Sequence, residues 1–429
     1  MNDALRELGE QWLHPGTKGL PLQKPLRQDA IGGLGLNVLD GLLSYPVAVL
    51  RQSTLDHNIA WMRDFVERAD ALLAPHGKTT MSPQLFQAQL DAGAWAMTLA
   101  TIPQLRVAHR FGVKRVLLAN QPVAIGDIES LATLLRDDAE FQAWVLVDSA
   151  AGVLRLNQVM QRVAPLRRLP VLVELGADGG RAGVRGLDAA LQLAREIRAA
   201  SHLTLAGVEG YEGLWVGADR AADLRKVETL LSELVELTRR CDSEDLFEGE
   251  EILLSAGGSA YFDFVAQAFA GLTDTSRPLR RVLRSGCYLT SDHGFYHGLQ
   301  QEMRTRHDAS FSHGLQPALE VWAMVQSRPE PGLALLTLGK RDASYDIDLP
   351  KPLCWHRPGD GVPRPMRDAR IVKMNDQHAY LELPAEHPLQ VGDLVATGIS
   401  HPCTTFDKWP LMLLIDDEFR VTGAINTFF

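Results

Sequence analysis

The sequence is poor in cysteine and has no long hydrophobic run. Its four cysteines, Cys241, Cys287, Cys354 and Cys403, form no CxxC pair and show no spacing typical of a disulfide framework. We therefore expect a reducing, cytoplasmic compartment. No uninterrupted run of about 18 apolar residues occurs, so no membrane span is expected. The first ten residues are polar and acidic, which is unlike a signal or transit peptide.

An excess of positive charge is also absent. The chain has 43 Lys and Arg residues against 53 Asp and Glu residues, which gives a formal net charge of -10. This balance argues against binding to nucleic acid or to an anionic membrane surface. What the chain does have is 429 residues, of which 46% are hydrophobic and 22% charged. We expect a soluble protein with enough core for two domains.

A regular alternation of apolar runs and helical patterns begins at Pro46. Eight apolar runs separated by segments with apolar residues at helical spacing predict a parallel (β/α)8 barrel of the TIM type. A doubly wound sheet is the alternative, but no GxGxxG motif stands where its first turn would need one. The eight predicted strands are residues 46–50, 71–74, 96–100, 115–119, 143–147, 171–175, 203–207 and 251–255.

The pattern changes after about residue 285. Short β-type runs, such as Leu319–Val325, are separated there by turns rich in Gly, Pro and Asp. This pattern predicts a second, mostly antiparallel β domain. We therefore divide the chain into an N-terminal arm (1–44), a barrel (45–290) and a C-terminal β domain (291–429).

Lys78 follows the second predicted strand. Pro75 ends the apolar run, Gly77 gives the backbone freedom beside the lysine, and Thr79 to Pro83 resemble the cap and first turn of a helix. The lysine is then expected at a strand-to-helix junction, where barrels carry their chemistry. A partly desolvated lysine in such a place can form a Schiff base. A solvated loop lysine is the simpler interpretation.

Another candidate is the loop Ser255-Ala-Gly-Gly-Ser259, at the end of the last predicted strand. Gly257 and Gly258 would let backbone N–H groups close on an anion, and the flanking serines would add hydroxyl donors. Late loops of barrels often bind phosphate in this way. A plain turn fits the same residues.

Two further loops follow predicted strands. Arg181 stands in the glycine-rich segment 174–184, where its guanidinium could bind a phenolate or a carboxylate, although a surface arginine fits as well. Tyr211 lies in the segment 207–213 and could stack on a bound ring or simply pack.

In the second domain, His401 and Cys403 flank Pro402. On an extended chain, residues two apart point the same way, and imidazole and thiolate are both zinc ligands. Two protein ligands would leave coordination positions open for water or substrate.

On a helix, His293 and His297 would share one face at the spacing of two metal ligands. The intervening Gly294 instead favours a loop, with Asp292 or His293 near the site.

Taken in order, these motifs resemble the fold-type III pyridoxal-phosphate enzymes, the alanine-racemase-like barrels, in their D-serine dehydratase / D-threonine aldolase branch. The resemblance runs from about residue 45 to the C-terminus. It rests on the segments Leu55–Met62, Pro75–Thr79, Arg181–Val184, Ser255–Ser259, Arg284–Tyr288 with Asp292, and His401–Cys403.

The resemblance implies roles for single residues. Lys78 would carry pyridoxal 5'-phosphate and act as the base at the substrate Cα, and Arg181 would hold the phenolic oxygen. His401 and Cys403 would hold a divalent metal, zinc or manganese. The remaining implied cofactor contacts are His76, Tyr211, Ser255, Gly257, Gly258, Ser259 and Tyr288.

The resemblance further implies a homodimeric lyase acting on a D-3-hydroxy amino acid. Relatives with a cysteine at the second metal position are typically dehydratases, and those with an aspartate are typically aldolases, so Cys403 favours dehydration of a substrate such as D-serine. Retro-aldol cleavage and racemisation stay open. A cofactor carrier protein would lack the β domain and the metal pair, and a metal-only hydrolase would need more ligands at strand ends. Two segments, Lys78–Met81 and Phe406–Trp409, depart from the pattern of the relatives and leave the substrate undecided.

Overall fold

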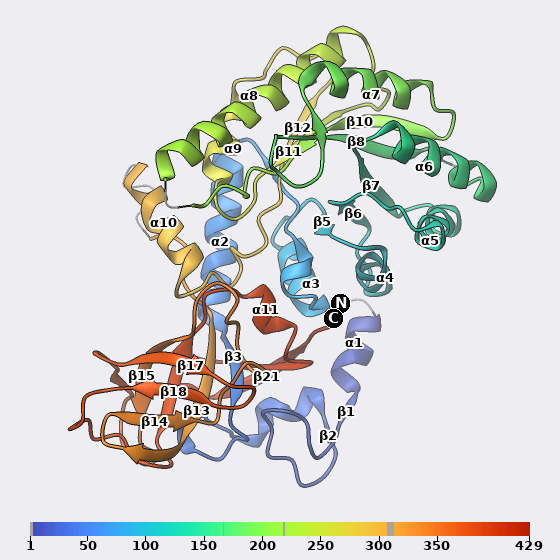
Figure 1. Ribbon diagram of the computed structural model, residues 1–429. Helices are drawn as coiled ribbons and strands as arrows, with labels where there is room; N and C mark the ends of the chain where they lie inside the picture. Colours follow the sequence, from blue (N-terminus) through green and yellow to red (C-terminus); the bar gives the residue numbers. More distant parts are fainter. Residues whose placement is uncertain (1–2, 166, 218, 307–312) are drawn as a thin grey trace. The chain divides into compact units, whose positions relative to one another are not determined.

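A computed structural model describes residues 3–165, 167–217, 219–306 and 313–429 (Figure 1). The chain forms two compact units. We call the first the sheet unit; it comprises Met1–Trp61, Thr79–Leu85 and Cys287–Phe429. We call the second the barrel unit; it comprises Met62–Lys78 and Phe86–Gly286.

The barrel unit is built on eight parallel strands. They are β4 (Leu72–Leu73), β5 (Met97–Leu99), β6 (Arg115–Leu118), β7 (Gln142–Val147), β8 (Leu169–Gly176), β10 (Leu203–Gly210), β11 (Ile252–Ala256) and β12 (Leu279–Leu283). Their order is β4-β12-β11-β10-β8-β7-β6-β5, with the short β9 (Val184–Arg185) beside β8. A parallel bridge between His76 and Thr98 joins the two ends of this order. The predicted (β/α)8 barrel is confirmed.

The interior of the barrel is apolar. Each of the eight strand segments contributes one residue to a single buried cluster, as expected where the inward-facing side chains of a small barrel meet. The members are Ala74, Ala96, Leu117, Leu146, Leu172, Ala206, Leu253 and Val282.

Three of the helices between the strands begin after a capping side chain. Thr101, Ser149 and Asp219 each accept a hydrogen bond from a backbone N–H in the first turn of the helix that follows. The helices are α2 (Gln52–Arg68), α3 (Pro83–Asp91), α4 (Ile102–Arg110), α5 (Ile125–Asp137), α6 (Ala150–Val163), α7 (Leu187–Ala199), α8 (Arg220–Ser243) and α9 (Phe262–Ala270).

The sheet unit contains a ten-stranded sheet, and its strand pairs are antiparallel apart from one parallel pair. Its strands are β3 (Val47–Arg51), β13 (Leu319–Glu330), β14 (Leu333–Leu336), β15 (Lys351–His356), β16 (Arg364–Pro365), β17 (Arg370–Met374), β18 (Ala379–Glu382), β19 (Leu394–Gly398), β20 (Leu411–Ile415) and β21 (Val421–Asn426). The unit also holds α10 (Phe295–Arg306) and α11 (Cys403–Phe406). The predicted antiparallel β domain is confirmed.

The N-terminal segment belongs to this unit as well. Its elements are α1 (Asp3–Glu10), β1 (Trp12–Leu13), β2 (Leu26–Arg27), η1 (Gln28–Leu34) and η2 (Val38–Asp40). Leu20, Ile31 and Val38 share one core cluster with Trp322 and Leu413 of the sheet. The segment therefore packs as part of the sheet unit.

One predicted barrel strand is wrong. The predicted run 46–50 overlaps β3 (Val47–Arg51), which pairs antiparallel with β13 and parallel with β20 and so lies in the sheet unit. The eighth barrel strand is β12, which the apolar pattern missed. The chain passes between the two compact units after Trp61 (within α2), after Lys78, after Leu85 and after Gly286.

Among the described residues, none of the helices is both long enough and apolar enough to cross a membrane.

Candidate functional site

Lys78 lies just beyond the C-terminal end of β4, in the short 3-10 helix η3 (Gly77–Thr79). The backbone N–H of the nearby His76 donates to the Arg284 carbonyl at 3.2 Å. A Cβ at Gly77 would lie 2.8 Å from the Phe86 ring, so the turn beside the lysine needs glycine. The Lys78 side chain is exposed, where partial desolvation was expected.

His76 carries an unsatisfied buried atom. Within the described part of the chain, its Nδ1 has no hydrogen-bond partner. Burial, reinforced by the positive charges of Lys78 and Arg284, holds the pKa of His76 well below its usual value. The ring is therefore neutral near pH 7, and its Nδ1 can donate or accept one hydrogen bond, depending on the tautomer.

A buried ion pair joins Glu209, on β10, to Arg284, just after β12. Arg284 also donates to the Gly210 carbonyl at 2.8 Å. Burial raises the pKa of Glu209 to about 8, against the opposing effect of the Arg284 charge. Glu209 Oε2 and Arg284 Nε have no partner among the described residues. Neither residue was singled out as a site residue from the sequence.

Two predicted residues, Arg181 and Tyr211, lie together in the barrel unit. The Arg181 guanidinium lies over the Tyr211 ring, 4.9 Å from its centroid. The same ring lies against the loop after β11, because a Cβ on Gly258 would be 2.8 Å from it. Arg181, Tyr211 and Gly258 therefore line one region at the C-terminal ends of the strands.

The predicted phosphate loop follows β11. Gly257 has a φ of +94°, a conformation that favours glycine. The N–H groups of Gly257 and Gly258 both donate to the carboxylate of Glu212, which the sequence did not single out. Ser255 lies inside β11, and its hydroxyl donates to the Val282 carbonyl at 3.1 Å. Ser259 follows directly in the loop.

The barrel unit fits a polar, ring-shaped cofactor. The unsatisfied atoms of His76, Glu209 and Arg284 are the kind that a bound heterocycle with polar substituents can satisfy. Lys78, Arg181 and Tyr211 add an amine, a guanidinium and an aromatic face in the same unit. These groups match the needs of pyridoxal phosphate, whose ring carries a nitrogen, a phenolic oxygen and an aldehyde.

The predicted metal pair lies in the sheet unit. Nδ1 of His401 is 2.5 Å from Oδ2 of Asp346, whose other oxygen accepts the Thr404 hydroxyl at 2.7 Å. A carboxylate on one imidazole nitrogen fixes the ring and leaves Nε2 for a metal, as is usual for histidine ligands. Asp346 was not predicted from the sequence.

Cys403 begins α11 and has a second thiol beside it. Its Sγ lies 3.8 Å from the Cys287 Sγ and 3.4 Å from the Thr79 hydroxyl oxygen. The Cys403 thiol and burial raise the pKa of Cys287. Nothing in the local sequence points to Cys287 as a neighbour of Cys403. Among the described residues, no group of three or more His, Cys, Asp or Glu side chains is arranged for a metal.

The group around Asp292 has a structural explanation. Its carboxylate accepts hydrogen bonds from the backbone N–H groups of Gly294, Tyr296 and His297, at the start of α10. His293 precedes the helix and His297 lies within it. Tyr288, a predicted cofactor contact, is buried in the sheet unit.

Asparagine in place of Asp346 should weaken zinc binding by about 10- to 100-fold, because the amide cannot hold the His401 ring as a carboxylate does. Asp348→Asn, two residues away, is the matched control and should bind zinc like the wild type. Competition with a chromogenic chelator measures both affinities. Equal zinc affinity in both variants would show that Asp346 does not position His401.

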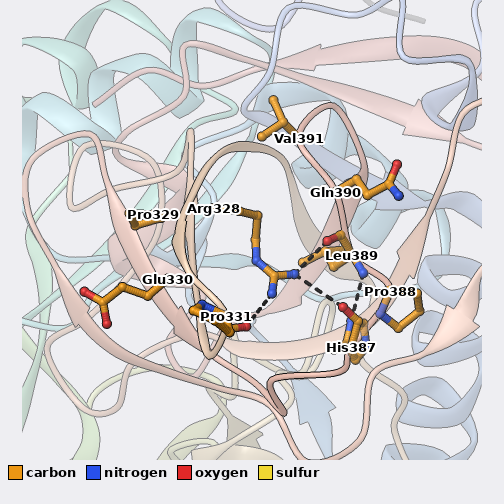
Figure 2. Close-up of a pocket in the computed structure, with 9 residues that line it drawn as sticks. All are labelled: Arg328, Pro329, Glu330, Pro331, His387, Pro388, Leu389, Gln390 and Val391. Carbon is orange, nitrogen blue, oxygen red and sulfur yellow. Dashed lines mark hydrogen bonds between the residues drawn. The ribbon is translucent and has the colours of Figure 1, made fainter.

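A separate pocket lies in the sheet unit (Figure 2). Its central side chain, Arg328, donates to the carbonyl oxygens of Pro331, His387 and Leu389. These bonds fasten two loops to each other and use the guanidinium for structure. None of the residues lining this pocket is a predicted site residue.

Two protein-family models match the sequence of this chain. A model described as "Alanine racemase, N-terminal domain" matches residues 50–270, which is just over half of the chain. The chain belongs to this family. A second model, described as "Putative serine dehydratase domain", matches residues 318–415 in the sheet unit. The family's fold-type III enzymes depend on pyridoxal phosphate.

Three similar proteins span most of the chain. The 3-hydroxy-D-aspartate aldolase of Paracoccus denitrificans (strain Pd 1222) is 24% identical over 79% of this chain and 80% of its own length. The D-threonine aldolase of Filomicrobium marinum superimposes with a TM-score of 0.75 at 21% identity, covering 92% of this chain and 97% of that one. The D-threo-3-hydroxyaspartate dehydratase of Delftia sp. HT23 gives a TM-score of 0.71 at 20% identity, covering 90% and 98%. All three of these proteins are aldolases or dehydratases of D-3-hydroxy amino acids.

Proposed function

We propose that this chain is a pyridoxal-phosphate- and zinc-dependent lyase that eliminates water from a D-3-hydroxy amino acid. The released enamine then takes up a water molecule and hydrolyses to a 2-oxo acid and ammonia. The observation that carries the proposal is the His401–Cys403 pair with Asp346 on His401 Nδ1, in a chain whose barrel unit presents Lys78 beyond β4. A thiol at the second metal position favours zinc over harder ions.

Two chemical groups would supply what side chains cannot. When bound, pyridoxal phosphate would serve as an electron sink for charge at the substrate Cα, and zinc would polarise the β-hydroxyl. Lys78, His76, Arg181, Tyr211 and the loop after β11 would hold the first group, and His401 and Cys403 the second.

Side chains of the protein would move the proton, bind the anionic oxygen and orient the metal ligand. The Lys78 amine would take the proton from the substrate Cα. Arg181, stacked on Tyr211, would hold an anionic oxygen in its planar fork. Asp346 would keep His401 Nε2 directed at the metal.

A dehydratase among the relatives supports the choice of reaction. A D-threo-3-hydroxyaspartate dehydratase has been solved as a cysteine-to-alanine mutant in the metal-free form and as a histidine-to-alanine mutant, and the two mutated positions are two apart in number. His401 and Cys403 have the same spacing here. A thiolate in that position is what the proposed zinc site needs.

Retro-aldol cleavage to glycine and an aldehyde is the second candidate. The similarity to two aldolases over most of the chain favours it. It would use the same binding groups, with a base at the β-hydroxyl.

Product analysis separates the two reactions. With D-serine, D-threonine and D-threo-3-hydroxyaspartate supplied separately to the zinc-loaded holoenzyme, we expect a 2-oxo acid and an equal amount of ammonia from at least one of them. Glycine with an aldehyde would instead identify an aldolase. L-serine is the control and should give no product above the blank. Neither pair of products from any D-substrate would overturn the lyase proposal.

A further inference from the structure

Glu212 has no role in the proposed reaction, yet it is completely buried in the barrel unit. It stands two residues after the end of β10. Its Oε1 accepts the Gly258 N–H at 2.7 Å, and its Oε2 accepts the Gly257 N–H at 3.1 Å. One carboxylate thus binds two consecutive backbone amides.

The two amides form an anion-binding loop. Gly257 has a positive φ, and a Cβ there would lie 2.9 Å from the Leu283 side chain. A Cβ on Gly258 would lie 2.8 Å from the Tyr211 ring. Consecutive N–H groups turned to one side in such a loop bind an anionic oxygen well. The anion that they bind in this structure is a side chain of the same protein.

The charges around Glu212 do not cancel its own. Arg284, after β12, is the cation that acts on it, but Arg284 forms an ion pair with Glu209. Glu174 on β8 and Arg181 in the next loop also act on Glu209. Burial raises the pKa of Glu212, against the effect of the loop N–H groups. A phosphate brought to this loop would meet a second anion on the same donors.

We propose that Glu212 is an internal occupant of the anion loop, and that its carboxylate and the phosphate of the cofactor exclude each other from the N–H groups of Gly257 and Gly258. This inference rests on the proposed cofactor. Glu212 then sets how much the phosphate contributes to cofactor binding. A phosphate can use both N–H groups only after the carboxylate has moved or taken up a proton.

Comparing pyridoxal 5'-phosphate with pyridoxal isolates this effect, because pyridoxal lacks the phosphate. Dissociation constants for both are measured from the visible absorbance band, in the wild type, in Glu212→Gln and in Glu228→Gln. Glu228 is exposed on α8 and serves as the matched control. Glu212→Gln should raise the preference for the phosphorylated form by about tenfold, since it removes the repulsion between two close anions. Glu228→Gln should keep the wild-type preference.

An unchanged or lower preference in Glu212→Gln would overturn the inference, while leaving the proposed function intact. Absence of the band with both compounds would overturn the proposed cofactor instead. Binding of inorganic phosphate, followed by calorimetry, would then still decide the role of Glu212, because Glu212→Gln should bind it about tenfold more tightly. Equal binding to the wild type and the variant would reject that role.

A second variant, Glu212→Asp, tests the inference if Glu212→Gln does not fold. Its carboxylate is one methylene shorter, so it cannot accept from both the Gly257 and the Gly258 N–H groups as Glu212 does. The preference for the phosphorylated form should therefore rise in Glu212→Asp as well. A preference equal to that of the wild type would overturn the inference.

Discussion

Replacing Lys78 with alanine should abolish the visible absorbance band of lysine-bound pyridoxal phosphate and reduce turnover by at least about 10⁴-fold. Both effects have one cause, because the same amine would hold the cofactor covalently and move the proton at Cα. The exposed position of Lys78 beyond β4, in a turn that only glycine at 77 allows, gives the amine access to a ligand. Absorbance spectra and initial rates of the purified variant measure the two effects.

Lys226→Ala provides the matched control. Lys226 is exposed on α8 in the same barrel unit, so its loss tests whether removing any lysine charge matters. Its spectrum and turnover should match those of the wild type. A Lys78→Ala protein that keeps the band would mean that another lysine binds the cofactor. The circular dichroism spectra of both variants should confirm that each is folded.

The architecture could be predicted because its signal is repeated many times. Seven of the apolar runs read as barrel strands do lie in the barrel, so one misplaced run did not change the fold. Residues 46–50 misled because a fully buried strand looks the same in a parallel and an antiparallel sheet. β12 was missed because Arg280 and Arg281 break its apolar run. The sheet that a strand joins is decided by the strands with which it pairs. These partners lie far apart in the sequence, so the local pattern of apolar residues does not reveal them.

The candidate site was predictable where a motif surrounds it. Arg181, Tyr211 and Gly258 stood in glycine-rich segments after strands, and the structure brings these three together. Glu209 and Glu212 lay in the same segment as Tyr211, but nothing local distinguishes a buried acid from a solvated one. The one local feature that could have drawn attention to them is that two glutamates, Glu209 and Glu212, stand within four residues just after the end of a predicted strand.

Partners from distant segments were not predictable. Asp346 is 55 residues from His401 and stands in no motif. Cys287 is 116 residues from Cys403 and stands in no motif with it. Arg284 was noted as part of a returning segment, but its ion pair with Glu209 depends on the barrel bringing β10 and β12 to the same end. Tertiary structure alone creates these contacts.

Removing the metal should reduce turnover by at least about 10³-fold, because loss of a β-hydroxyl without a Lewis acid forgoes several kcal/mol of charge stabilisation. Dialysis against a chelator followed by zinc should restore the rate. Cys403→Ala should show the same loss and should not recover with added zinc. Cys354→Ala is the matched control, since Cys354 lies on β15 in the same unit, and it should keep its zinc and its rate. Full turnover in the metal-free protein would contradict the proposed role of the pair.

Cys403→Asp tests what the thiol contributes beyond charge. Aspartate keeps a negative ligand two residues from His401 but replaces soft sulfur with hard oxygen, so zinc affinity should fall and the preference should shift towards manganese. Metal content after equilibration with both ions measures the shift. If the thiol also selects dehydration, the manganese-loaded variant should release less 2-oxo acid and more glycine from D-threonine. A variant that still prefers zinc and gives unchanged products would show that the residue at 403 sets neither the metal nor the reaction.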